Sequence, residues 1–102
     1  MEKPTIKTID GNEHKMIELT GRAYRILAEF DKNQPLPTDA DYIERHAAFV
    51  AEFYDGVTKD DVLDMPLDDI LPAAFNAQKF TYAFTWRKVQ EISKNFDEDK
   101  EQ

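Results

Sequence analysis

Apolar residues recur at helical spacing over residues 20–30 and again over residues 43–54. In both stretches the charged residues fall on the opposite side of the helical wheel, as they do in helices that rest one face on a core. We predict two amphipathic helices, the first capped by Thr20 and the second beginning at Thr38 or Asp39. The prolines between the two stretches forbid one continuous helix.

Residues 55–66 contain the signals that end the second predicted helix and begin two further helices. Asp55 and Gly56 end that helix, because glycine readily adopts the left-handed conformation in which many helices terminate. Thr58 and Asp61 have the spacing of a capping box, which predicts one or two helical turns. Pro66 then breaks this short helix and stands near the start of the next one.

The two ends of the chain are more polar. Residues 1–15 fit either a short β-hairpin, with strand-like residues 5–9 followed by an Asp-Gly turn, or a disordered arm. Residues 96–102 place carboxylates at the C-terminal end of the last helix, where the helix dipole disfavours them, and predict a flexible acidic tail. We expect an all-α (mainly α) fold: a single domain over residues 1–95, with three to five helices and a long C-terminal helix over about 67–95.

The predicted last helix carries apolar residues on two sides of a wheel of about 100° per residue. The first arc consists of Leu67, Leu71, Ala74, Phe75, Tyr82, Trp86, Val89 and Ile92. The second arc lies nearly opposite and consists of Ile70, Ala73, Ala77, Phe80 and Phe84. A helix that rests on one side of a small domain needs a single apolar stripe. Two interpretations stay open: the helix is central and covered on both sides, or one side is kept for a partner.

Burial energy decides which side chains would need such a partner. Leaving Phe80 and Phe84 exposed would forgo roughly 1.5–3 kcal/mol of burial each, a large share of a small domain's stability. We therefore hypothesise that the second arc binds another protein. The candidate binding residues are Ile70, Ala73, Ala77, Phe80 and Phe84. The partner would be an amphipathic helix or a neighbouring copy of the chain.

The composition narrows the classes of function. The net charge is −8, from 13 basic and 21 acidic residues, which opposes binding to nucleic-acid backbones and anionic lipid surfaces. There is no cysteine, which excludes disulfides, thiolate nucleophiles and cysteine-based zinc sites. No stretch is apolar enough for a signal peptide or a membrane span. We expect a cytoplasmic protein with no nucleic-acid or membrane partner.

Candidate catalytic groups are few. His46 lies on the apolar face of the second predicted helix, where a buried and hydrogen-bonded histidine is the usual explanation, and His14 lies in a polar segment. The carboxylates of residues 55–69 lack the alternating spacing and the glycine of an EF-hand, and helix capping explains most of them. No nucleotide-binding, metalloprotease or hydrolase motif is present. We expect no metal, no cofactor and no enzymatic activity.

Two stretches of the sequence resemble a known family: LTGRAYR over residues 19–25 and FYDGVTKDDVLDMPLDDILP over residues 53–72. They are similar to the tail assembly chaperones of long-tailed bacteriophages (siphoviruses) and prophages of Gram-positive hosts, and the likeness runs from about Met16 to Asn95. The resemblance implies a small acidic helical protein that coats the hydrophobic tape measure protein during tail morphogenesis and is absent from the mature virion. It also implies the short form of such a protein. Recruitment of the tail tube protein would depend on a frameshifted extension.

Other functions stay open beside this resemblance. An acidic decoy would mimic nucleic acid to inhibit a host enzyme, but its carboxylates would have to follow one surface, whereas here they cluster at predicted helix starts. A metal-assisted hydrolase would use the carboxylates of residues 55–69. An antitoxin-like regulatory protein would cover a toxin with its helices. A helix with two apolar sides also invites self-association into a homo-oligomer.

Overall fold

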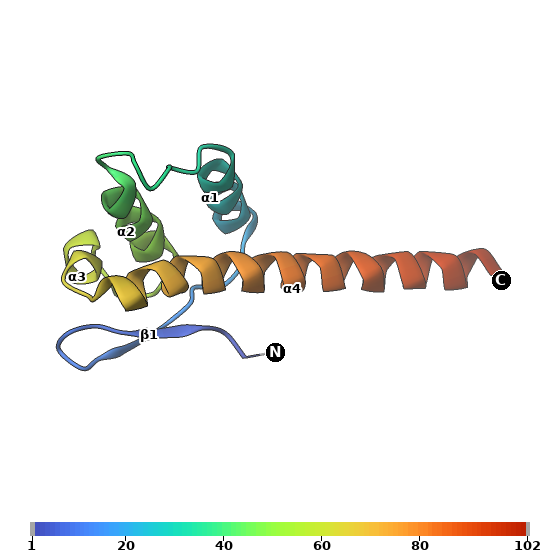
Figure 1. The fold of residues 1–102 in the computed structure, drawn as a ribbon. Coiled ribbons are helices and arrows are strands. Elements are labelled where there is room, and N and C mark those ends of the chain that lie inside the picture. The colour runs from blue at the N-terminus through green and yellow to red at the C-terminus, as the bar shows by residue number, and fades with distance from the viewer. Residues whose placement is uncertain (1, 102) are drawn as a thin grey trace.

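The computed structural model describes residues 2–101, and the side chains of residues 2–95. The elements in chain order are β1 (Thr5–Lys7), β2 (Glu13–Lys15), α1 (Gly21–Lys32), α2 (Tyr42–Phe53), α3 (Lys59–Leu63) and α4 (Leu67–Glu101). Helices α1 and α2 lie on one side of the N-terminal half of α4, and the β1–β2 hairpin lies on the other (Figure 1). The protein is therefore mainly helical with a long C-terminal helix, as predicted, and its N-terminal segment forms the hairpin rather than a disordered arm.

The hairpin is tied to the end of α2 by backbone hydrogen bonds. Its turn contains Gly11 at φ +87°, a left-handed conformation that glycine adopts without steric cost. The Ile17 N–H donates to the Phe53 carbonyl at 3.0 Å, and the Asp55 N–H donates to the Lys15 carbonyl at 2.9 Å. These bonds hold β2 and the segment after it against the point where the chain leaves α2.

Two predicted helix caps are confirmed. The Ala23 N–H donates to Thr20 Oγ1 at 3.1 Å at the start of α1. At the start of α3 the Asp61 N–H donates to Thr58 Oγ1 at 3.1 Å, and the Thr58 N–H donates to the Asp61 carboxylate at 3.0 Å. The reciprocal pair satisfies two backbone donors that a helix of this length would otherwise leave unpaired.

The predicted start of the second helix is wrong. Helix α2 begins at Tyr42, later than Thr38 or Asp39. The Asp39 carboxylate accepts a hydrogen bond from the Leu36 N–H at 2.8 Å and so closes a turn behind the proline-rich loop instead of capping a helix. Aspartate favours both roles, because its short carboxylate reaches nearby backbone donors in either geometry.

The core lies between α2, α4, α3 and the hairpin. Phe53 is fully buried, and Phe49 stacks on Phe30 of α1 with ring centroids 4.3 Å apart. Tyr54, just after α2, is 1% exposed, and its hydroxyl donates to the Ala73 carbonyl of α4 at 2.9 Å. The small side chains of α4 on this side allow α2 to pack closely against it.

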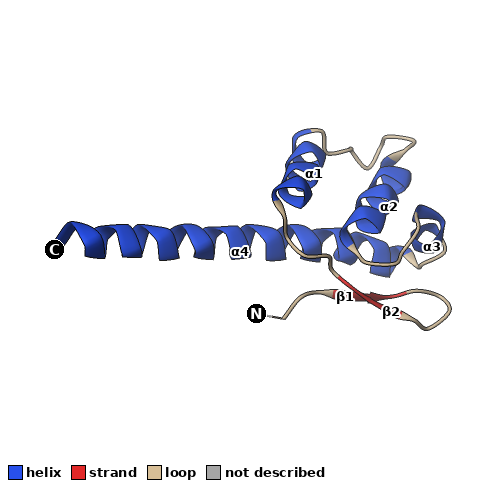
Figure 2. Cartoon of the chain, turned by 180° about the vertical axis from the view of Figure 1, so that it is seen from behind, coloured by secondary structure: helices blue, strands red, loops and turns tan. Residues whose placement is uncertain are grey.

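Helix α4 is continuous and nearly straight, and its C-terminal half projects beyond the other elements (Figure 2). It runs through Pro72, which lacks the N–H that the Asp68 carbonyl would normally accept; both residues are exposed, so water can replace that bond. The projection gives overall dimensions of 57 × 30 × 21 Å and a radius of gyration of 16.2 Å. A compact chain of this length would have a radius of about 13 Å.

The predicted end of the last helix near residue 95 differs from the structure, in which the α4 backbone stays helical to Glu101. The predicted flexible tail comprises residues 96–102, whose side chains lie outside the part of the chain that the structure describes. Its flexibility therefore stays a prediction.

Candidate protein-binding face of the last helix

The second arc of α4 faces the core. Ile70, Ala73 and Ala77 are at most 3% exposed, Phe80 is 9% exposed, and Phe84 is half-buried. Of the two interpretations left open for α4, the structure shows coverage of the first four residues, because α2 and β1 pack on α4. A partner-binding role for the five residues stays a prediction. Phe84 is the one among them that a partner could contact without opening the core.

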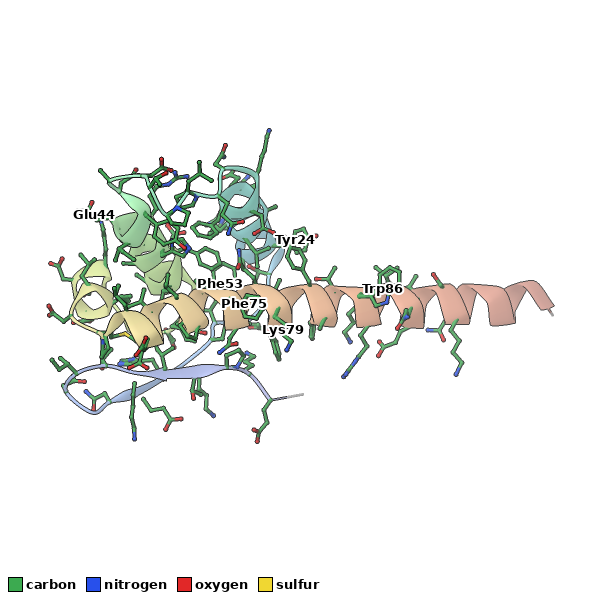
Figure 3. The ribbon with its side chains drawn as sticks, in the orientation of Figure 1. Tyr24, Glu44, Phe53, Phe75, Lys79 and Trp86 are labelled. Atoms are coloured by element: carbon green, nitrogen blue, oxygen red, sulfur yellow. The ribbon has the colours of Figure 1, made fainter. Side chains whose placement is uncertain are left out.

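The exposed apolar side chains of α4 lie on the first arc instead. We call five of them the exposed arc: Phe75, Tyr82, Trp86, Val89 and Ile92. Their exposed fractions run from 40% for Tyr82 to 68% for Ile92. They fall within about 120° of the helix circumference and extend over about 25 Å of its length. Trp86 stands on the part of α4 that projects past α1 (Figure 3).

Helix α1 borders the inner end of the exposed arc. The ring of Tyr24 meets that of Tyr82 edge-on, with centroids 6.3 Å apart. The Asp31 carboxylate accepts a hydrogen bond from the Gln78 amide at 2.6 Å and another from the Tyr82 hydroxyl. Desolvation, and to a smaller extent the hydrogen bond to Asp31, raise the pKa of Tyr82 to about 12. The phenol therefore stays neutral at physiological pH. These contacts fix the arc relative to the globular part of the molecule.

Basic residues are frequent along the projecting half of α4. Residues 79–95 contain four basic side chains and one acidic side chain, a net charge of +3 within a chain of net −8. The Lys88 ammonium lies 3.5 Å from the Glu91 carboxylate and 5.5 Å from the centroid of the Phe84 ring. Arg87 and Lys88 lie on the same side of α4 as Phe84 of the second arc, away from the exposed arc.

A surface hollow of about 400 Å³ lies on the other side of α4. Phe80 and Phe84 form its apolar wall, with Leu19 from the segment that leads into α1, and Lys3 and Arg87 are among its charged lining. The hollow is where the second arc comes nearest to the surface.

The two histidines have structural roles in this fold. His46 is 5% exposed, its Nδ1 donates to the Tyr42 carbonyl at 2.8 Å, and its ring meets that of Phe30 edge-on. His14 Nδ1 lies 2.9 Å from the Asp55 carbonyl, so it links the hairpin to the α2–α3 junction, a role the sequence did not indicate. Among residues 2–95, no three His, Cys, Asp or Glu side chains lie close enough together to hold a metal ion.

No protein-family model matches the chain, and no match was found among curated proteins or solved structures. In the part of the chain that the structure describes, no helix combines the length and the apolar character needed to cross a membrane.

The sequence contained a signal that distinguishes the two arcs. Ala73 and Ala77 of the second arc lie on a buried side of α4, and small residues at such spacing mark a close helix–helix contact. The exposed arc has three of its large side chains, Trp86, Val89 and Ile92, farther along the helix than any residue of the second arc. Both features can be read from residue positions, although aromatic content alone makes the two arcs look alike.

Proposed function

We propose that the protein is a tail assembly chaperone of the kind that long-tailed bacteriophages use, a non-enzymatic protein that binds and solubilises the tape measure protein in the host cytoplasm. The observation that carries the proposal is the exposed arc, a row of large apolar side chains on a helix that projects from the globule. Such rows on a protein surface mark sites of protein interaction. The resemblance of residues 19–25 and 53–72 to this family supports the choice of partner.

The exposed arc suits a helix-in-groove mode of binding. An amphipathic helix of the tape measure protein would lie along α4 and cover Trp86, Val89 and Ile92 with its own apolar face. The net positive charge of residues 79–95 would favour a cargo helix that is acidic overall. Binding would thus hide apolar surface of both proteins from water.

The remainder of the molecule would keep the complex in solution. Residues 1–78 contain eight basic and sixteen acidic side chains, so the globular part carries a net charge of −8. Surfaces with net charge well away from zero resist association and precipitation. The chaperone would leave before the virion matures, and recruitment of the tail tube protein would require the frameshifted extension.

Co-expression with the tape measure protein of the same phage tests the proposal. We expect the double variant Trp86→Asp, Ile92→Asp to remain folded and to yield at least about tenfold less soluble tape measure protein, the change that a loss of about 1.4 kcal/mol in binding produces. The matched control is Ile9→Asp, because Ile9 is 78% exposed but lies on the hairpin turn. A folded double variant that solubilises as much tape measure protein as the control contradicts the proposal.

Phe80 is unsuitable for this test. At 9% exposure its replacement by aspartate would bury a carboxylate without a partner and unfold the domain. A loss of solubilisation would then report folding rather than binding.

A further inference from the structure

We propose that the free protein is a dimer in which the projecting halves of two α4 helices pair antiparallel about a two-fold axis close to Val89. The dimer would cover Trp86 and Val89 until a cargo helix displaces the second copy. The inference rests on the proposed function only in that last step, because the pairing itself needs no cargo.

Three residues of the exposed arc have the spacing of one heptad of a coiled-coil seam. Tyr82 and Val89 are seven residues apart, and Trp86 lies between them. In an antiparallel pair centred near Val89, Trp86 of one copy lies against Val89 of the other, and the symmetric contact repeats it. The apolar patch of Trp86 and Val89 can therefore pack against the same patch of a second copy.

Charge favours the antiparallel orientation over the parallel one. Residues 79–95 carry net charge +3, and residues 96–102, with four acidic side chains and one basic side chain, carry −3. In a parallel pair, residues 79–95 of one copy would lie beside residues 79–95 of the other, and the two acidic ends would also lie side by side, so that like charges would repel. An antiparallel pair sets the acidic end of each chain alongside the region of Lys79 in the other, so that opposite charges meet on both sides of the axis.

The size of the contact indicates a weak dimer. Pairing from residue 79 to residue 96 joins the two helices over about 25 Å, at an interaxial distance of about 8–10 Å. A single helix pair of this length lies at the small end of stable protein interfaces, so we expect a dissociation constant of roughly micromolar order. A longer apolar cargo helix could then displace the second copy.

Sedimentation equilibrium of the protein alone tests the pairing. We expect the apparent mass to rise from monomer toward dimer between about 1 and 200 μM, as a roughly micromolar constant requires. Trp86→Asp should raise the dissociation constant at least about tenfold, the effect of losing a central aromatic contact, and Ile9→Asp should leave it unchanged. Wild-type protein that stays monomeric throughout this range, or a Trp86→Asp variant that dimerises as the wild type does, overturns the proposal.

Spin-label distances test the orientation. The chain has no cysteine, so Asn76→Cys and Gln90→Cys each give a single labelling site at an exposed residue of α4. In the antiparallel dimer the two Gln90 labels should be about 10–15 Å apart and the two Asn76 labels about 35–40 Å apart, from the rise of 1.5 Å per residue. A parallel pair would place both label pairs at short distance, which overturns the antiparallel arrangement. Neither experiment contains the tape measure protein, so failure here leaves the proposed function to its own test.

Discussion

Tyr54 connects three parts of the fold through one side chain. It follows α2, its backbone forms a bridge with Met16 beside the hairpin, and its hydroxyl donates to the Ala73 carbonyl of α4. Its burial raises the pKa of the phenol to about 12 from an ordinary value of 10.0. At the residue scale, then, the neutral phenol is part of what holds α2, the hairpin and α4 together.

The pH dependence of stability tests this role of Tyr54. The folded state holds the phenolic proton more tightly than the unfolded state, so the contribution is complete below pH 10 and is lost as the pH rises through about 12. We expect Tyr54→Phe to lower the free energy of unfolding by about 0.5–1.5 kcal/mol at pH 7. Above pH 10 the wild type should lose up to about 1.4 kcal/mol per pH unit more than the variant.

Urea denaturation of both proteins between pH 7 and 11.5 measures this difference, and lysine titration cancels between them. Thr38→Ala, in the exposed turn before α2, serves as the control and should follow the wild type. Wild-type and Tyr54→Phe curves that stay parallel above pH 10 would show that the buried phenol does not titrate as described.

At the scale of elements, α3 shows how local chemistry and packing share the stabilisation of a short helix. It has five residues, too few to be helical alone in water. The capping box of Thr58 and Asp61 satisfies its first donors, and Val62 is fully buried against the core. Its position between α2 and α4 fixes where α4 begins.

Removing the cap should weaken the whole fold. We expect Thr58→Ala to lower the free energy of unfolding by about 1 kcal/mol, the usual cost of losing a threonine cap. Thr38→Ala, in the exposed turn before α2, should change it by less than about 0.5 kcal/mol. Equal effects of the two substitutions in thermal or urea unfolding would mean that the capping box contributes nothing to stability.

The two arcs of α4 should also differ in their contribution to stability. Phe80→Ala removes a buried ring and should cost about 3 kcal/mol or more. Trp86→Asp replaces a side chain that is 64% exposed and should change the free energy of unfolding by less than about 0.5 kcal/mol. Unfolding measured well below micromolar concentration keeps dimerisation out of the comparison. A larger cost for Trp86→Asp than for Phe80→Ala would reverse the assignment of the arcs.

What the sequence predicted correctly was set by local chemistry. Thr20 and Thr58 act through backbone groups within a few residues, so their roles could be read directly. The end predicted at Asp55 and Gly56 lies past the end of α2, whose C-cap Tyr54 is extended. The start of α2 was misplaced because Asp39 had two local roles open to it. Which arc of α4 is covered depends on where α2 and the hairpin dock, a tertiary question that the periodicity of one helix does not answer.

At the scale of the whole molecule, the acidic globular part and the basic, apolar stretch of α4 lie at opposite ends of one long axis. A globular part of net charge −8 occupies one end, and a basic apolar stretch of α4 extends from it within a molecule 57 Å long. The arrangement places Trp86, Val89 and Ile92 where a partner helix can lie along them beyond the contacts that α1 makes with Tyr82. Binding would therefore need little rearrangement of the core, and its affinity would depend on the arc itself.

Trp86 provides the most direct measurement of whether this face binds a cargo helix. It is the one tryptophan of the chain and lies in the middle of the exposed arc, so its emission reports the environment of the proposed site. At concentrations low enough for the protein to be monomeric, we expect titration with amphipathic segments of the tape measure protein to shift the emission to shorter wavelength and to saturate. A segment that binds, as measured independently by calorimetry, while the Trp86 emission stays that of a water-exposed indole would contradict binding at this face.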